Sequence, residues 1–338
     1  MYIYCGYALL TFLSCLWSFD QSLSTIRSYT YIEFALLIYI SGCIRSKEED
    51  KQLLKKALIW SSRFTAILLL LIGEYYEDRL TFMGTFDEDP NYLCMYFSFG
   101  IIGALEKTLK SDHYKKNLIL SLFELLAYIY IVLLTGSRGG LIAIIASICA
   151  FVILERNKIS KSRLLLLYLL FGSVSFYIVT HLSNIVSFSE RYTLDEVISS
   201  GGTGRVDIWD FGWKTFLDFN NFNKFFGSGI ATTNYLFSIH GFKIKVMHNI
   251  FLETLVEIGI VGIILYTYMI CSFLIASYKN KNYYSFSILI GFIVLSLSTS
   301  LSTFKPYLNI MIFIVILTST NKGTGTTQAQ NTPSNQQT

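Results

Sequence analysis

Charged residues are scarce in this chain: they make up 15% of its 338 residues, whereas a soluble domain carries roughly 25%. Proline is scarce as well, with three residues in all, so long helices are seldom interrupted. Hydrophobic residues account for 53% of the chain, and long apolar runs recur from end to end. This composition argues against a soluble enzyme and predicts an all-α, polytopic integral membrane protein.

Cysteine spacing excludes several other classes of site. The six cysteines lie singly within apolar runs, and none has the spacing of a metal-binding or redox motif. We therefore expect the cysteines to be small buried residues in helix packing, and we expect no metal and no cofactor. The chain also has no Walker motif and no paired histidines of the kind that hold haem or quinone. A reaction catalysed here would have to use a substrate that is already activated in the membrane.

The apolar runs predict a helical bundle of about ten transmembrane helices with one large external loop. Met1 enters an apolar run with no basic residues ahead of it, so we expect no cleavable signal peptide, and the abrupt start leaves room for a further span upstream. The expected spans lie near residues 1–17, 28–44, 57–73, 92–105, 118–134, 140–154, 164–180, 249–276, 284–302 and 306–319.

Basic residues are distributed unequally between the two sets of loops. Sixteen lysines and arginines fall on one side, whereas the short loops opposite hold Arg27, Arg79, Arg138 and Lys305. Because basic loops stay in the cytoplasm, both termini are expected inside a cytoplasmic membrane and the opposite turns outside. The net charge of +4 then reflects topology, so the lipid bilayer is an expected partner and nucleic acid is not.

This topology divides the chain into four parts. The external loops include a stretch at 18–27, another at 74–91 and the large one, which is the only part outside the spans long enough to hold structure of its own. The C-terminal tail has almost no apolar residues and is expected to be disordered. The four parts are an N-terminal transmembrane bundle (1–180), the large loop with an amphipathic helix (181–247), C-terminal transmembrane helices (248–319) and the tail (320–338).

A short polar turn, TGSRGG (Thr135–Gly140), separates two apolar runs. Ser137 is a candidate N-cap for the second run, and Gly139 allows close backbone approach. Free N–H groups at a helix N-terminus attract anions, and Arg138 adds a bidentate donor beside them. The turn predicts a site for a diphosphate at the outer leaflet. The alternative is an interfacial arginine that extends into the lipid headgroups.

Arg205 follows a glycine-rich stretch in the large loop and begins a predicted helix at Val206–Leu217. A basic residue in the first turn opposes the helix dipole, and a bound anion would offset that cost. The alternative is a solvated arginine paired with a nearby aspartate. The helix is expected to lie on the membrane surface or against the bundle, with Trp209 beside the substrate. The residues expected on its apolar face are Val206, Trp209, Trp213 and Phe216.

His248 opens the longest apolar run, Asn249–Ala276. A neutral imidazole there can accept a proton from a sugar hydroxyl or donate a hydrogen bond to an oxyanion. Asn249 is a candidate substrate contact, and Glu253 is a candidate for orientation or proton transfer, because a carboxylate inside a span usually faces a polar interior. The alternative is a purely structural histidine at the membrane interface.

The loop Glu74–Asn91 holds two further candidates. Asp87 and Asp89 form a DxD-type pattern that resembles a diphosphate–metal motif, although such short patterns often match by chance. Arg79 is instead expected to join Arg138 and Arg205 at the substrate. Three other charges within or near the spans are expected to pair inside the bundle: Glu33, Arg63 and Glu124.

Taken in order along the chain, several of these segments resemble a known family. The sequence RLTFMGTFDEDPNYLCMY is followed by TGSRGG, GRVDIWDFGW, FFGSGI and HNIFLETLVEIGIVGIIL, with the large loop between the second and the last. This pattern is similar to that of the O-antigen polymerase/ligase superfamily, which includes Wzy-like polymerases and lipid A-core ligases. The resemblance extends from Arg79 to the last span, and the segment that begins at His248 is its most specific part.

The resemblance implies a GT-C-like fold and metal-independent, inverting transfer of glycan from undecaprenyl diphosphate at the outer face of the membrane. By the same resemblance, Arg138 and Arg205 would hold the diphosphate and His248 would activate or position the acceptor hydroxyl, which argues against a metal at Asp87 and Asp89. Implied partners are an undecaprenyl-diphosphate-linked oligosaccharide and, in the same pathway, a chain-length regulator and a flippase.

Two other functions remain as alternatives. A ligase would use the same chemistry but transfer the glycan to a lipid A-core or protein acceptor. A transporter or flippase for lipid-linked glycan would require polar residues along one path through the middle of the bilayer. The candidate residues gather instead at external helix ends, which favours an enzyme, and a polysaccharide polymerase is our main hypothesis.

Overall fold

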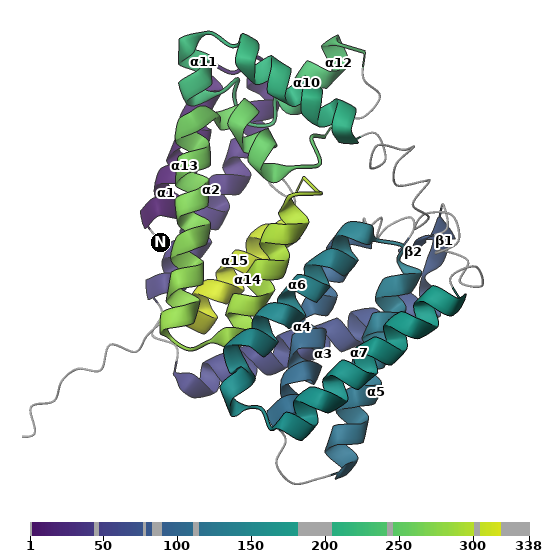
Figure 1. The fold of residues 1–338 in the computed structure, drawn as a ribbon. Coiled ribbons are helices and arrows are strands. Elements are labelled where there is room, and N and C mark those ends of the chain that lie inside the picture. The colour runs from purple at the N-terminus through teal and green to yellow at the C-terminus, as the bar shows by residue number, and fades with distance from the viewer. Residues whose placement is uncertain are drawn as a thin grey trace, which may run out of the picture.

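The computed structural model is a bundle of α-helices with a layer of shorter helices at one end (Figure 1). It describes residues 2–43, 47–76, 79–82, 90–110, 115–181, 205–241, 246–300 and 305–318. The bundle helices are α1 (Tyr2–Leu13), α2 (Gln21–Cys43), α3 (Glu48–Ile72), α4 (Pro90–Lys110), α5 (Lys115–Leu134), α6 (Arg138–Glu155), α7 (Lys161–His181), α13 (Ile250–Lys279), α14 (Tyr283–Ser296) and α15 (Lys305–Thr318). The shorter elements are the 3-10 turns η1 (Ser14–Leu16) and η3 (Arg156–Lys158), the strands β1 (Glu74–Tyr76) and β2 (Arg79–Thr81), and the helices α10 (Arg205–Asp218), α11 (Asn221–Phe226) and α12 (Thr233–Ile239).

The protein is an all-α membrane protein apart from the antiparallel β1–β2 hairpin. Each of the ten expected spans overlaps one of the described helices. Within the described residues, three stretches are long and apolar enough to cross a membrane: Asn117–Leu134, Arg138–Lys158 and Ile250–Lys279. Only 33–39% of the most apolar part of each stretch is buried. An apolar surface exposed to that extent is suited to contact with lipid rather than water.

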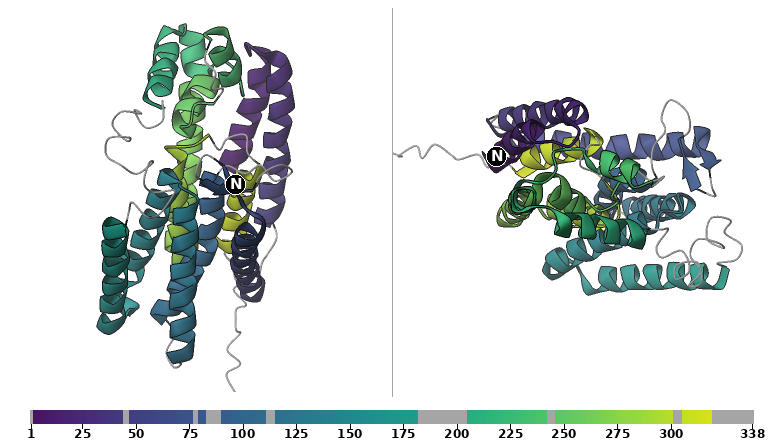
Figure 2. Two further views of the ribbon diagram at one scale, coloured as in Figure 1. Left: turned by 90° about the vertical axis from the view of Figure 1, so that its right-hand side faces the viewer. Right: turned by 90° about the horizontal axis from the view of Figure 1, so that it is seen from above.

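Helix α4 lies at the centre of its half of the bundle, because it packs against α3, α5, α6 and α14. In the middle of α4, every residue from Phe97 to Leu105 is buried, as expected of a helix enclosed by others. Phe97, Ile101 and Leu105 are fully buried along its length. On the other side of the molecule from α7, α1 packs against α13, and α2 packs against α1 and α15 (Figure 2). The first turn of α4 is therefore fixed by helices on several sides.

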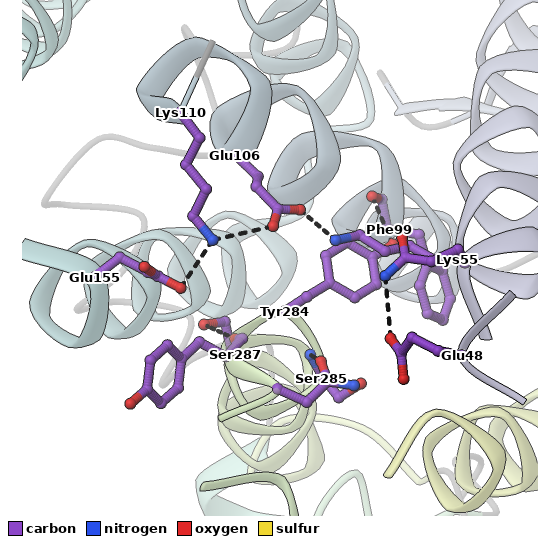
Figure 3. A network of polar contacts seen from close by, with 12 residues as sticks. Glu48, Lys55, Phe99, Glu106, Lys110, Glu155, Tyr284, Ser285 and Ser287 are labelled. Atoms are coloured by element: carbon purple, nitrogen blue, oxygen red, sulfur yellow. Dashed lines mark hydrogen bonds and ion pairs between the residues drawn. The ribbon is translucent and has the colours of Figure 1, made fainter. Parts of the chain in front are cut away.

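A polar network ties the far ends of these helices together (Figure 3). The carboxylate of Glu106 accepts hydrogen bonds from Lys55 and, at 3.2 Å, from Lys110, which also reaches Glu155 at 2.9 Å. The ammonium group of Lys55 lies 4.5 Å from the ring centroid of Tyr284. The network joins α3, α4, α6 and α14 at the C-terminal ends of α4 and α6. The opposite end, where α4 and α6 begin, holds the candidate site.

Two of the charges expected to pair within the bundle do so. The Nε and Nη2 nitrogens of Arg63 each donate to the Glu124 carboxylate at 2.7 Å. This pair connects α3 to α5. The pair is partly covered, with side chains 21% and 19% exposed. The bidentate geometry satisfies two charges that would be costly alone in an apolar environment. The expectation that the six cysteines are buried is mostly wrong: Cys94 is buried, Cys5 and Cys15 are partly buried, and Cys43, Cys149 and Cys271 are exposed.

The structure corrects the expected bounds of two loops. Residues 21–27 belong to α2, so Arg27 lies within a helix. The 74–91 stretch contains the β-hairpin, and its last two residues form the first turn of α4, with Pro90 at the position where proline is favoured. Asp87, Asp89 and the tail lie outside the described residues, as does the 182–204 part of the large loop.

The expected continuous span at Asn249–Ala276 is wrong in one respect, because α13 breaks at Gly259. This residue has φ 75° and ψ −168°, which only glycine adopts readily. The break frees the carbonyl oxygens of Val256 and Glu257, which accept hydrogen bonds from the backbone N–H groups of Ser228 and Gly229 at 3.0 and 2.9 Å. Residues 260–279 alone extend about 30 Å, enough to cross a bilayer. The stretch before Gly259 is therefore a separate half-helix that carries the residues following His248.

Candidate functional site

The SRGG turn (Ser137–Gly140) forms the N-terminus of α6. Gly136, with φ 59°, ends the preceding helix in the left-handed conformation. Ser137 is the N-cap, and its hydroxyl accepts the Gly140 N–H at 2.9 Å, as expected from the sequence. Arg138 is half-buried, and no hydrogen bond or ion pair of its guanidinium is found among the described residues. The turn thus presents a cation and first-turn N–H groups at one helix end.

The glycines of this turn are required by packing against the protein itself. A Cβ at Gly139 would lie 2.4 Å from the Ser298 hydroxyl oxygen, and a Cβ at Gly140 would lie 2.5 Å from the Cys94 Sγ. The close approach that we expected at Gly139 is therefore made by Ser298, which follows α14. The α6 N-terminus is wedged between α4 and the end of α14, so its orientation is fixed.

Arg79 lies beside the same turn. Strand β2 carries it to the C-terminal end of α5, where its Nε donates to the carbonyl oxygen of Thr135 at 3.3 Å. A cation at a helix C-terminus is favoured by the helix dipole. The hairpin therefore places Arg79 next to the SRGG turn.

His248 occupies a constrained backbone position directly before α13. Its φ of 50° is left-handed, which is uncommon for a residue with a side chain. Its N–H donates to the Ser300 hydroxyl at 2.8 Å. Asn249 is the N-cap of α13 and accepts the N–H groups of Phe251 and Leu252, each at 3.1 Å. The Asn249 amide oxygen, proposed from sequence as a substrate contact, thus serves the helix.

Trp209 contacts the residue directly before His248. Its indole N–H donates to the carbonyl oxygen of Met247 at 3.1 Å, and Met247 also fills the space above Gly212, where a Cβ would lie 2.6 Å from its sulfur. Helix α10 therefore packs on the residue before His248. Arg205, the first residue of α10, lies one turn before Trp209 on the same side of the helix.

The expected apolar face of α10 is partly wrong. The buried positions are Ile208, Gly212 and Phe216, whereas Val206 and Trp213 are 57% and 50% exposed. A glycine contributes no hydrophobicity to a pattern, so Gly212 was overlooked as the point of closest approach. The helix packs against the bundle, as one of the two expected arrangements required.

The segment Ser298–Ser300 joins the SRGG turn to His248. Ser298 contacts Gly139, and Ser300 accepts the His248 N–H through its hydroxyl. Two residues extend at most about 7 Å, so Gly139 and His248 contact residues that lie close together on one short segment. The carbonyl oxygen of Ser300 also accepts the Tyr92 hydroxyl at 2.7 Å. Sequence reasoning missed these serines, because hydroxyls at the end of an apolar run resemble ordinary helix-ending residues.

The two carboxylates of α13 differ in role. Glu257 is 1% exposed and accepts the hydroxyl of Thr233 at 2.6 Å and its N–H at 3.2 Å, so it anchors the start of α12. Glu253 is 4% exposed and lies one turn after the N-cap, on the half-helix that follows His248. Its position keeps it a candidate for orientation of the site. Within the described part of the chain, no group of three potential ligands is arranged to hold a metal.

The arrangement gathers a group of cationic and amide donors and a histidine around one segment. The SRGG turn can bind an anion, and His248 can position a hydroxyl beside it. A family model described as O-antigen ligase (Wzy_C) matches residues 123–267, which include both the SRGG turn and His248. The resemblance to the O-antigen polymerase/ligase superfamily is thereby confirmed, and the family carries out polymerase- or ligase-type glycan transfer.

A solved structure shows that the fold extends beyond the O-antigen ligase family match. One chain in a structure titled "Structural coordination of polymerization and crosslinking by a peptidoglycan synthase complex" has a TM-score of 0.52 and 16% sequence identity to this chain. The similarity covers 94% of this chain and 96% of the other, and at this identity it concerns the fold alone. No curated protein matches the sequence significantly.

Proposed function

We propose that this protein is a polysaccharide polymerase of the cytoplasmic membrane. It would transfer a growing glycan from undecaprenyl diphosphate to the non-reducing sugar of another lipid-linked repeat unit, as an inverting, metal-independent glycosyltransferase of GT-C type. The observation that supports this most directly is the Ser298–Ser300 segment, which contacts both the helix end carrying Arg138 and the residue His248. In this proposal, the donor site and the acceptor site are adjacent.

In this proposal, the diphosphate leaving group binds at the N-terminus of α6. Arg138 and the first-turn N–H groups stabilise its charge, and Arg79 beside the turn adds to the positive potential. Arg205 approaches from α10, on the side of that helix which holds the residue before His248. His248 accepts the proton of the acceptor hydroxyl as the new glycosidic bond forms and the diphosphate departs.

The unequal distribution of basic residues supports a site on the extracytoplasmic face, with both termini in the cytoplasm. The lipid-linked oligosaccharide is then the substrate partner, and a chain-length regulator and a flippase of the same pathway are proposed as protein partners. A ligase would use the same donor site with a lipid A-core or protein acceptor. A transporter would move the lipid-linked glycan without forming a bond.

Purified protein in lipid vesicles, supplied with a defined undecaprenyl-diphosphate repeat unit, tests the proposal. Chain growth that persists in EDTA and is abolished in Arg138→Ala, Arg205→Ala and His248→Ala is the expected result. Transfer only after lipid A-core is added would indicate the ligase, and movement of the repeat unit across the bilayer without polymer would indicate the transporter. Full activity in His248→Ala would remove the role given to that residue.

A further inference from the structure

Two neighbouring residues in the first turn of α4 each contact one half of the candidate site. Asn91 is 4% exposed, and its side-chain oxygen accepts the Ser137 hydroxyl at 2.5 Å. Tyr92 donates its hydroxyl to the Ser300 carbonyl oxygen at 2.7 Å. One bond leads to the N-cap of the helix that begins with Arg138, and the other leads to the segment that holds His248.

The Asn91 contact determines how the Ser137 hydroxyl is used. A hydroxyl has one proton and two lone pairs. Because the proton goes to Asn91, a lone pair remains directed at the Gly140 N–H, which is the N-cap bond. Asn91 therefore fixes the rotamer of the cap and, through it, the first turn of α6. The same side-chain oxygen lies 3.6 Å from the position of a Cβ on Gly139, so it also limits how far that turn can move.

The Tyr92 contact acts on the other half. Ser300 uses its carbonyl oxygen for Tyr92 and its hydroxyl for the His248 N–H, so a shift of Ser300 shifts His248. His248 has a left-handed backbone, which persists only when the surroundings hold it. Helix α4 supplies a rigid reference, since its residues beyond Tyr92 are enclosed by other helices.

We infer that Asn91 and Tyr92 are positioning residues that hold Arg138 and His248 at a fixed separation. This inference rests on the proposed function for its effect on catalysis. Asn91 acts on the donor side through its bond to Ser137, and Tyr92 acts on the acceptor side through its bond to Ser300. Their adjacency on one helical turn makes the two halves of the site move together.

The kinetic test compares variants that each remove one bond. Tyr92→Phe and Ser300→Ala are expected to lower kcat by about 100-fold, the order of loss caused by a small misplacement of a catalytic group, with little change in the KM for the donor. Asn91→Ala is expected to raise the donor KM. Ser300→Thr retains the hydroxyl and should recover most of the activity. Ser296→Ala is the matched control, because its hydroxyl donates to the Phe292 carbonyl oxygen of its own helix.

A second measurement does not depend on catalysis. Hydrogen exchange of the peptide spanning Met247–Ile250 should be faster in Tyr92→Phe and Ser300→Ala than in the wild type, and unchanged in Ser296→Ala. If the wild type shows no glycan transfer but exchange responds as expected, the proposed function fails and the mechanical coupling stands. If exchange and kcat are both unchanged in Tyr92→Phe, the positioning role is overturned.

Discussion

The indole Nε1 of Trp209 donates a hydrogen bond to the carbonyl oxygen of Met247, the residue directly before His248. This bond connects a helix of the large loop to the start of the half-helix in α13. The loop is thus connected to the candidate site through the residue directly before His248.

Replacing Trp209 tests this connection. In Trp209→Phe the ring and most of its packing remain while the hydrogen bond is lost, so we expect a roughly 10-fold fall in glycan transfer, equivalent to about 1.4 kcal/mol, with little effect on folding. Initial rates and thermal unfolding in detergent measure the two effects. The control is Trp213→Phe, at an exposed position of the same helix. Equal losses in the two variants would contradict the assignment.

Gly259 is expected to tolerate no side chain. Gly259→Ala would place a Cβ 2.4 Å from the Phe225 carbonyl oxygen and force a residue with a side chain into a backbone region suited to glycine. We expect a loss of about 3 kcal/mol or more in unfolding free energy. The measurement is unfolding in mixed detergent micelles. Gly172→Ala, in an open helical position of α7, should be neutral or slightly stabilising.

The contact between Gly139 and Ser298 predicts a rescue. Gly139→Ala alone should overpack the turn, at a cost of roughly 1–3 kcal/mol, and impair glycan transfer. Ser298→Ala removes the oxygen that the new methyl group would meet, and leaves the Ser298 Cβ at an ordinary 3.4 Å. The double variant should therefore be more stable and more active than Gly139→Ala. A double variant no better than the single one would show that a bound ligand, rather than Ser298, excludes the side chain.

The Arg63–Glu124 pair is expected to stabilise the protein without serving the reaction. Arg63→Met or Glu124→Met leaves one charge without its partner and should cost about 3 kcal/mol. The double variant should recover most of that loss, because no uncompensated charge remains. Resistance to heating in detergent and glycan transfer at low temperature separate stability from activity. Loss of activity in the double variant despite full stability would assign this pair a part in catalysis.

Much of the site could be predicted from short sequence patterns. Ser137 as the N-cap and Arg138 as the first residue of α6 followed from a polar turn between two apolar runs, and the structure has both. The pairing of Arg63 with Glu124 followed from the cost of unpaired charge in an apolar environment. These features depend on neighbours in sequence or on simple compensation of charge, so a pattern can report them.

Other features depend on segments that meet only in the folded chain. The break at Gly259 exists because Ser228 and Gly229 supply hydrogen bonds to the freed carbonyl oxygens, and nothing in the local apolar pattern distinguishes this glycine from Gly262. The buried face of α10 is set by Met247 against Gly212. Asn91 and Tyr92 were recognised only as part of a resembling segment, since their partners are far along the chain.

The sequence by itself determined that this protein is helical and membrane-embedded, that Arg138 begins a helix and that His248 precedes one, because apolar periodicity and capping residues act locally. The tertiary structure decided that these two residues share a site. That outcome rests on one segment after α14 and one turn of α4, whose hydrogen bonds join elements more than 40 residues apart in sequence. Contacts of this kind arise from the packing of whole helices, so no local pattern encodes them.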